Sequence, residues 1–286
     1  MIEVIQDTLI DAIKLLPFLF ITYLIMEYIE QKMGEKSKNA IKNSKRFGPI
    51  VGSVLGAFPQ CGFSVSATNL YAGKVITLGT LISVYLSTSD EMLPIFISES
   101  VSPIIILKIL GIKIVIGIIA GIIIDIVVKI INKEKNEENI EIHHICEEKH
   151  CHCEQEGIMK STINHTFSIF IFIVIISFII NIVVYYIGEE NIANLILNKK
   201  IVGPFIASLI GLIPNCAASV IITNLYLEKV ISLGSMISGL LTGAGIGIAV
   251  LFKINNKITE NIKIILLIYG IGAISGIIIE LLGICL

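Results

Sequence analysis

Long stretches without a charged side chain dominate this 286-residue sequence. Twenty-eight uncharged residues separate Lys160 from Glu189, and 27 separate Arg46 from Lys74. A helix needs roughly 20 mostly apolar residues to cross a bilayer. These runs are continuously apolar and lack the alternation of a transmembrane barrel. We therefore predict an all-α, polytopic integral membrane protein, and the composition excludes a soluble enzyme and a nucleic-acid-binding protein.

The chain contains an internal duplication. Residues 48–87 align without a gap to residues 203–242, at an offset of 155, and 20 of the 40 positions are identical. Shared apolar composition does not explain matching Pro, Cys, Asn, Tyr and Lys residues in one register. We predict a membrane repeat at 1–131, an acidic hydrophilic linker at 132–160 and a second membrane repeat at 161–286.

Each repeat is predicted to contain two interrupted helices. Pro59 and Pro214 lie at equivalent positions inside uncharged runs, where proline removes a backbone hydrogen bond. Such a break persists in lipid only where protein or a water-filled cavity satisfies the freed groups. The second interruption is predicted at residues 87–91 and at the equivalent residues 242–247.

Basic and non-basic loops exchange places between the two repeats. The loop at 32–46 is rich in Lys and Arg and its counterpart at 188–200 is mixed, whereas the loop at 253–263 is more basic than its counterpart at 98–107. By the positive-inside rule, the repeats are inverted relative to each other. An inverted repeat needs an odd number of crossings per half, supplied by a re-entrant proline segment or by five short spans. The linker then faces the cytosol, and the protein spans the cytoplasmic membrane several times.

Small residues and one acid make further local predictions. Gly117 and Gly121 are spaced by four residues and are matched in the second repeat by Gly272 and Gly276. This spacing predicts close packing of helices. Asp125, which also has a matched acid in the second repeat, is expected to extend to the membrane interface.

The two proline motifs are the first candidate site. Transporters built from inverted repeats bind substrate where broken helices meet near the membrane midplane. Two thiols, two amides and two hydroxyls would converge there, and thiolates favour soft ions. The alternative is that each cysteine is a small buried hydrophobic residue. The predicted site residues from these motifs are Pro59, Gln60, Cys61, Ser64, Pro214, Asn215, Cys216 and Ser219.

A polar cluster at the second interruption of the first repeat is the next candidate. Adjacent carboxylates at membrane depth are costly and usually face a pathway. Hydroxyls beside a carboxylate suit Mn²⁺ or a proton relay, whereas a solvated interfacial loop is the alternative. The second repeat has glycines at this place, which supply no side-chain ligands. The cluster comprises Ser87, Thr88, Ser89, Asp90 and Glu91.

The linker gathers most of the metal-ligating side chains of the chain. It holds four of the five histidines and three of the six cysteines, and residues 132–157 carry a local charge of −5 from eight acids and three lysines. Zn²⁺ takes such mixed nitrogen and sulfur ligands, but the spacing matches no zinc finger. We predict a flexible loop that collects or senses a transported or regulatory ion of the Zn, Mn or Co class, with no resident cofactor required. Its predicted ligands are His143, His144, Cys146, His150, Cys151, His152 and Cys153.

At both proline motifs and at the 87–91 cluster, the sequence resembles the ten-span heavy-metal exporter family, whose members are labelled arsenic efflux proteins or manganese transporters. The resemblance covers both halves and implies export of a metal or metalloid ion. One departure is that the second repeat lacks the acidic cluster, which excludes a carboxylate site with two-fold symmetry.

Together these features predict a secondary transporter that exports a divalent transition metal or arsenite, coupled to protons through Asp90 or Glu91. The chain has no Walker-type loop for ATP hydrolysis and no nucleophile–base pair, so it is not predicted to be an enzyme. A metal-responsive membrane sensor or partner subunit, and an anion or sulfur-compound permease, remain as alternatives. The expected partners are the ion and the lipid bilayer, with no nucleic acid, and a homodimer is compatible with this interpretation.

Overall fold

The computed structural model describes residues 47–58, 62–89, 92–132, 158–187 and 202–284, together with single residues between 13 and 24. The described residues form helices and connecting turns and contain no strand. The helices are α3 (Gly48–Gly56), α4 (Gly62–Ala72), α5 (Leu78–Ser87), α6 (Met92–Ser98), α7 (Pro103–Asn132), α9 (Ile158–Ile187), α11 (Val202–Gly211), α12 (Cys216–Leu227), α13 (Leu233–Thr242), α14 (Gly247–Ile254) and α15 (Ile258–Leu281).

The duplication is visible in where the helices begin. Helices α13, α14 and α15 each start 155 residues after α5, α6 and α7. This is the offset of the sequence repeat, so the two halves build the same succession of helices. The predicted interruptions are present as well. Pro214 lies between α11 and α12, and the polar and glycine-rich segments separate α5 from α6 and α13 from α14.

The turns after α4 and α12 repeat each other in detail. Lys74 and Lys229 both adopt left-handed backbone conformations, with φ of 55° and 60°. In each turn the next backbone N–H, that of Val75 or Val230, donates to a carbonyl five residues earlier, at 2.8 and 2.9 Å. This pattern satisfies the last carbonyls of a helix, usually with glycine at the left-handed position. Its repetition with lysine shows that the repeat extends to local backbone geometry.

Small residues bring three helices of each repeat close together. Helices α3, α5 and α7 pack on one another in the first repeat, as α11, α13 and α15 do in the second. A Cβ atom added to Gly121 would lie 2.6 Å from the carbonyl oxygen of Gly79, and one added to Gly276 would lie 2.6 Å from that of Gly234. The prediction of close packing at the four-spaced glycines is therefore confirmed.

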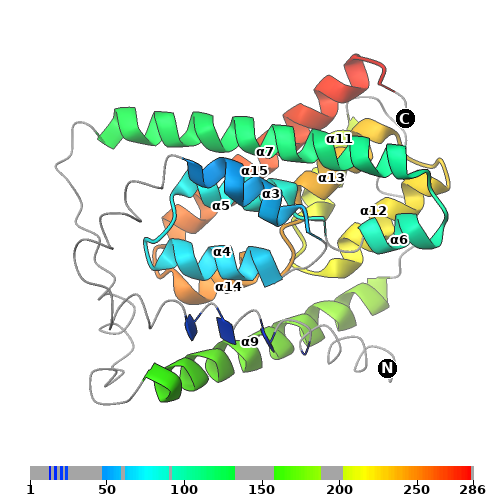
Figure 1. Ribbon diagram of the computed structural model, residues 1–286. Coiled ribbons are helices and arrows are strands. Elements are labelled where there is room, and N and C mark those ends of the chain that lie inside the picture. The colour runs from blue at the N-terminus through cyan, green and yellow to red at the C-terminus, as the bar shows by residue number, and fades with distance from the viewer. Residues whose placement is uncertain are drawn as a thin grey trace.

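The shortest helix of each repeat packs against the other repeat. Helix α14 of the second repeat packs on α4 of the first, and α6 of the first packs on α12 of the second. Helices α5 and α13 contact each other between them. Figure 1 shows these shorter helices between the long helices α7 and α9. The two repeats are therefore packed together through α4, α6, α12 and α14 as well as through α5 and α13.

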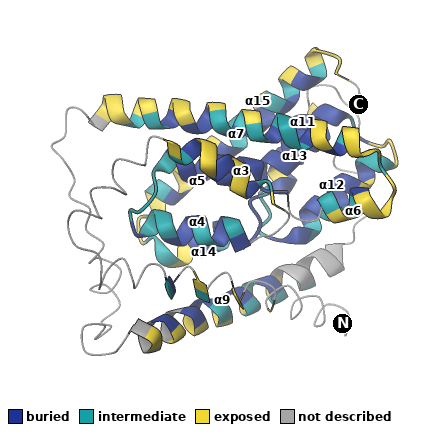
Figure 2. Ribbon diagram, viewed as in Figure 1, coloured by how far each residue is buried: buried dark blue, intermediate teal, exposed yellow. Residues whose placement is uncertain are grey.

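The exposed surface is apolar along the long helices. Isoleucines such as Ile119, Ile123 and Ile274 are more than half exposed, and Figure 2 shows this exposure along α7, α9 and α15. Among the described residues, three segments are long and apolar enough to span a membrane: Pro103–Ile131, Leu233–Ile254 and Ile258–Leu281. The segment Leu233–Ile254 contains α13 and α14, and 83% of its apolar 18-residue stretch is buried, against 22% and 33% of the corresponding stretches in the other two. The polytopic membrane class is thus supported, with a broken helix at the centre.

The equivalent long helices α7 and α15 run in roughly opposite directions (Figure 1). Lys108, near the start of α7, lines the same pocket as Ile278, near the end of α15. An inverted repeat would produce this relationship, but the predicted inversion across a membrane and the predicted re-entrant segments remain predictions. Residues 133–157, which include all seven predicted linker ligands, lie outside the described residues.

Candidate functional site

Two helices of the core end inside the protein. Helix α5 stops at Ser87, where the next residue, Thr88, leaves the helical conformation at φ −52° and ψ 127°. Helix α13 stops at the equivalent Thr242, and Gly243 has φ −72° and ψ 69°. Such ends leave backbone carbonyls that no longer have a helical partner. Both ends are buried, so these carbonyls must find partners within the protein or in a ligand.

The two interrupted helices meet at Gly247, the first residue of α14. The Tyr85 hydroxyl on α5 donates to the Gly247 carbonyl at 3.1 Å, and the Thr68 hydroxyl on α4 lies 3.2 Å from the same oxygen. Thr68 and Tyr85 are also 2.5 Å apart, oxygen to oxygen. A Cβ atom at Gly247 would lie 3.0 Å from the Ser64 hydroxyl, so glycine permits this approach. The predicted site residue Ser64 therefore borders a buried junction of α4, α5 and α14.

Asn69 extends this polar junction. The Tyr23 hydroxyl donates to Asn69 Oδ1 at 2.9 Å, whereas Asn69 Nδ2 is buried and has no hydrogen-bond partner among the residues that the structure describes. Buried polar atoms in native proteins nearly always have partners, and the exceptions call for water or a ligand. Asn69 was not predicted from the sequence, although its Thr-Asn-Leu-Tyr motif is one of the matched segments of the duplication.

The second repeat does not reproduce the junction. The residue equivalent to Tyr85 is Leu240, and the residue equivalent to Gly247 is Met92, both buried and apolar. Thr223 does keep the role of its equivalent, Thr68, in that its hydroxyl donates to the carbonyl four residues earlier. The polar centre is therefore asymmetric, as the acidic cluster is in the sequence.

The predicted hydroxyl cluster is buried at the end of α5. Ser87, Thr88 and Ser89 are at most 1% exposed. Their hydroxyls donate to backbone carbonyls nearby, at 2.8, 2.7 and 3.0 Å. Each hydroxyl has one proton to donate, so what these groups can offer a ligand is oxygen lone pairs. The Ser87 hydroxyl also faces Gly56 of α3, where it serves helix packing.

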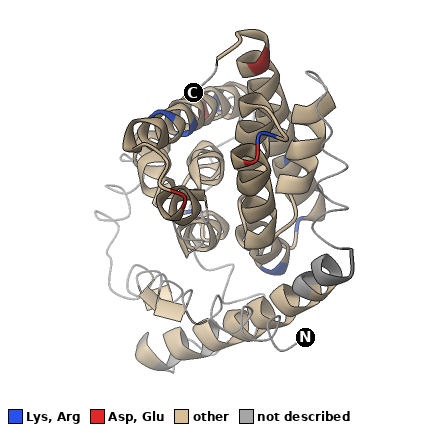
Figure 3. Ribbon diagram, turned by 90° about the vertical axis from the view of Figure 1, so that its right-hand side faces the viewer, with Lys and Arg blue, Asp and Glu red and all other residues tan. Residues whose placement is uncertain are grey.

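Lys113 is a site residue that sequence reasoning missed. It lies on α7 and its side chain is fully buried, with the ammonium donating to the Thr88 carbonyl. A lysine inside a 30-residue apolar helix is the signal that could have found it. This helix is not among the longest uncharged runs of the sequence, because Lys108 and Lys113 interrupt it. Figure 3 shows how sparse charged residues are on the described helices.

The second proline motif forms the start of α12. Asn215 Oδ1 accepts from the Ala217 backbone N–H at 3.5 Å as the helix cap, and the Ser219 hydroxyl donates to the Cys216 carbonyl at 2.8 Å. The Cys216 side chain is 7% exposed and belongs to the same buried apolar cluster as Val65, the neighbour of Ser64. The structure thus brings this motif and the helix following the first proline motif into one cluster.

Several predicted site residues cannot be placed. Pro59, Gln60 and Cys61 of the first proline motif, and Asp90 and Glu91 of the acidic cluster, lie outside the described residues. Within the described ranges, no three His, Cys, Asp or Glu side chains gather into a group that could hold a metal. Among the described residues, the predicted site residues offer hydroxyl, carbonyl and amide oxygens and the Cys216 thiol.

The acid Asp125 has a different role from the one expected. Its carboxylate accepts hydrogen bonds from the Gly79 backbone N–H at 2.9 Å and from the Thr77 hydroxyl at 2.7 Å. It therefore holds the first turn of α5 and does not simply reach for the interface. The capping role follows from tertiary packing of α7 on α5, which sequence spacing does not reveal.

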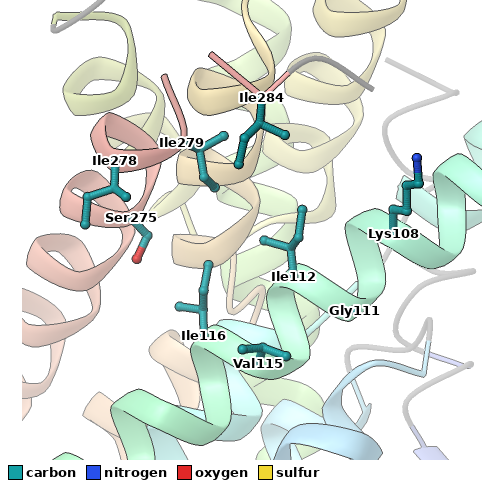
Figure 4. Close-up of a pocket in the computed structure, with 9 residues that line it drawn as sticks. All are labelled: Lys108, Gly111, Ile112, Val115, Ile116, Ser275, Ile278, Ile279 and Ile284. Atoms are coloured by element: carbon teal, nitrogen blue, oxygen red, sulfur yellow. The ribbon is translucent and has the colours of Figure 1, made fainter. Parts of the chain in front are cut away.

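A cavity of about 530 Å³ lies between α7 and α15, away from this polar centre. Figure 4 shows isoleucines of both helices, such as Ile116 and Ile279, facing it, with Lys108 at one end. Its lining is almost wholly apolar, and its walls are the exposed helices. It offers no set of ligands for an ion.

A family model described as a 10TM heavy-metal exporter matches residues 1–187. The match covers the first repeat, the linker and helix α9. No curated protein and no solved structure matches the chain.

Proposed function

The chain belongs to the 10TM heavy-metal exporter family, and we propose that it is a secondary transporter that moves a metal or metalloid ion out of the cytosol. The observation that carries this proposal is the meeting of the broken helices of the two repeats at Gly247. Discontinuous helices that meet at a buried polar centre are the usual place of substrate binding in such transporters. Alternating access would come from one repeat moving against the other.

The oxygen atoms at the end of α5 favour a hard or borderline divalent ion. Three buried hydroxyls and the Thr88 carbonyl lie together there, and such oxygens suit Mn²⁺ better than a thiophilic ion. Cys216, and Cys61 from the sequence, favour arsenite or Cd²⁺ instead. We therefore propose a divalent transition metal as the first substrate class and arsenite as the second.

Coupling to the proton gradient is proposed as the driving force. Asp90 and Glu91, which follow the buried hydroxyls in the chain, are the proposed proton carriers. The opposite directions of α7 and α15 support an inverted repeat, the arrangement that allows two alternating states to be built from one unit.

Growth of a deletion strain on a panel of toxic ions tests this proposal. The panel contains Mn²⁺, Zn²⁺, Co²⁺, Cd²⁺ and arsenite, and the strain carries the wild-type chain, Cys61→Ser, Cys216→Ser or Asp90→Asn. We expect at least tenfold higher tolerance of one ion class with the wild type, lost in Asp90→Asn. Loss in the cysteine variants would assign a thiophilic ion. Cys285→Ser, a cysteine without a counterpart in the other repeat, is the matched control. Unchanged tolerance of every ion would refute the exporter proposal.

One observation favours a second function, an anion permease. Lys113 is a fully buried cationic side chain on the apolar helix α7, and ionisable residues within membrane helices commonly mark the path of a substrate or ion. This alternative predicts uptake of an anion, with no metal phenotype in the same strain.

A further inference from the structure

The cavity between α7 and α15 opens onto the apolar surface of these two long helices. Its lining is almost wholly apolar, and Val115 and Ile278 at its rim are 53% and 50% exposed. Its volume of about 530 Å³ lies within the range of small-molecule sites, about 300–1,000 Å³. In a membrane protein such a surface faces lipid, so an occupant that enters from the bilayer must be apolar over most of its length.

The lining has the length of one membrane leaflet. On α7 it runs from Lys108 to Ile116, about 12 Å along the helix axis. The hydrocarbon core of a bilayer is about 30 Å thick, so one leaflet contributes about 15 Å. On α15 the lining runs from Ser275 to Ile284, in the second half of the helix and just after it. Because α7 and α15 run in roughly opposite directions, both stretches lie at the same end of the bundle.

Lys108 places a positive charge at one end of this apolar lining (Figure 4). It is exposed and lies within the first two turns of α7, where a long lysine side chain carries its ammonium towards the interface. Basic residues in pockets between membrane helices bind anionic lipid headgroups. An anionic phospholipid matches the cavity in both respects, because it joins a negatively charged phosphate to apolar chains.

The second repeat shows what makes room for such a ligand. The equivalent of Gly111 is Leu266, an exposed leucine on α15. A Cβ atom at Gly111 would meet no atom within 4 Å, so a leucine there would extend into the space of the cavity. Lys108 lies three residues before this glycine, on the same face of the helix. Its equivalent, Lys263, lies three residues before the leucine and is not part of the lining.

We propose that the cavity between α7 and α15 binds one anionic phospholipid, with an acyl chain along the isoleucine-lined wall and the phosphate at the Lys108 ammonium. The ligand is part of the surrounding bilayer and is distinct from the transported ion. It contacts both repeats, because α7 belongs to the first and α15 to the second.

The chain contains no tryptophan, so one introduced indole reports on its own surroundings. Ile278→Trp places the indole at the rim of the cavity. Ile123→Trp is the matched control, because Ile123 is the repeat equivalent, is 54% exposed and is not part of the lining. The full-length protein is reconstituted in phosphatidylcholine vesicles. A small, equal fraction of the lipid carries brominated acyl chains, either as phosphatidylglycerol or as phosphatidylcholine, and bromine quenches an indole that it contacts.

We expect brominated phosphatidylglycerol to bind beside the Ile278→Trp indole about fivefold more strongly than brominated phosphatidylcholine. This factor corresponds to about 1 kcal/mol for one lysine beside anionic lipid. The two lipids should quench the Ile123→Trp indole equally. In the Ile278→Trp background, Lys108→Gln should abolish the preference and Lys108→Arg should retain it. Lys263→Gln, at the equivalent exposed lysine, should leave it unchanged.

A second pair of variants tests the acyl-chain part of the site. Gly111→Leu fills the cavity with the residue that the second repeat has at this place, and should remove the preference for phosphatidylglycerol. Gly270→Leu is its control, because a Cβ at Gly270 also meets nothing within 4 Å and Gly270 is not part of the lining. If Ile278→Trp is not recovered as a monodisperse protein, Val115→Trp takes its place at the same rim.

Three results would overturn the proposal. The first is equal quenching of the Ile278→Trp indole by the two lipids, or a preference that survives Lys108→Gln. The second is the same preference at Ile123→Trp, which would show general enrichment of anionic lipid around the protein. The third is quenching by neither lipid at Ile278→Trp with normal quenching at Ile123→Trp, which would mean that a second copy of the chain covers the cavity. None of these results bears on the proposed ion transport, because the measurement contains no transported ion.

Discussion

The carboxylate of Asp125 binds the backbone N–H of Gly79 at 2.9 Å, across the interface between α7 and α5. The contact joins the last third of a long outer helix to the first turn of the central broken helix. The Thr77 hydroxyl donates to the same carboxylate, and its own oxygen caps the Thr80 N–H. The start of α5 is therefore held by two side chains, those of Thr77 and Asp125, whereas its end lies buried at the polar centre.

Removing this cap should destabilise the first repeat. Asp125→Ala leaves the Gly79 N–H and the Thr77 hydroxyl without their acceptor, which costs about 1–2 kcal/mol for a helix cap. We expect a lower midpoint of thermal unfolding in detergent and unaltered ion preference. Glu99→Ala, an exposed carboxylate in a loop, is the control. Equal midpoints for Asp125→Ala and the wild type would show that the cap contributes no stability.

Gly247→Ala should disturb the junction between α4 and α14. The added Cβ would lie 3.0 Å from Ser64 Cβ and from its hydroxyl, so Ser64 or the start of α14 must shift by a few tenths of an ångström. We expect at least a tenfold loss of transport in vesicles, with the protein still inserted. Gly270→Ala is the matched control, because a Cβ there meets nothing within 4 Å. That change should leave transport intact and stabilise α15 by up to about 1 kcal/mol. Normal transport by Gly247→Ala would show that close packing at this junction is not needed for transport.

Tyr85→Phe should weaken the same junction more gently. It removes the hydrogen bonds to the Gly247 carbonyl and the Thr68 hydroxyl while keeping the ring. A buried bond contributes about 1 kcal/mol, and leaving its partner unsatisfied costs more. We expect a loss of 1–3 kcal/mol in unfolding free energy, together with slower metal transport. Tyr269→Phe on α15 serves as the control, and identical effects of the two changes would argue against a special role for Tyr85.

A contact between the repeats can be measured by a double-mutant cycle. The Tyr71 hydroxyl at the end of α4 donates to Glu260 at the start of α15. Its repeat equivalent, Tyr226, instead faces the Phe96 ring, with centroids 6.4 Å apart. Tyr71→Phe and Glu260→Gln, alone and together, should give a coupling energy of about 1.5–3 kcal/mol in thermal unfolding, the range for a hydrogen bond to a charged group. Strictly additive effects would mean that the bond is not formed in the membrane.

Deleting residues 140–157 tests the linker independently of the membrane site. The deletion removes all seven predicted His and Cys ligands. We expect fewer Zn²⁺ ions bound per molecule by elemental analysis, with transport in vesicles unchanged at saturating metal. Transport abolished by the deletion, with a silent Cys61→Ser, would favour the sensor alternative.

The amino-acid sequence was sufficient for the large-scale features. Uncharged runs of more than 20 residues require helices that cross lipid, because an unpaired backbone is too costly there. Matched residues at an offset of 155 predicted two equivalent sets of helices, and α13, α14 and α15 begin at that offset from α5, α6 and α7. The close approach at Gly117 and Gly121 was also predictable, since no other residue type leaves room for a backbone contact.

What only the tertiary structure decided is which side chains share the interior. Tyr85 and Gly247 are 162 residues apart, and nothing in local periodicity indicates that their helices touch. Lys113 resembles an ordinary helix charge until its burial against Thr88 is known, and Asp125 resembles an interfacial acid until its bonds to α5 are known. Sequence patterns predict the local backbone conformation and which segments enter the membrane. The partner of a buried polar group depends on how distant helices pack, and here that packing exchanges helices between the two repeats.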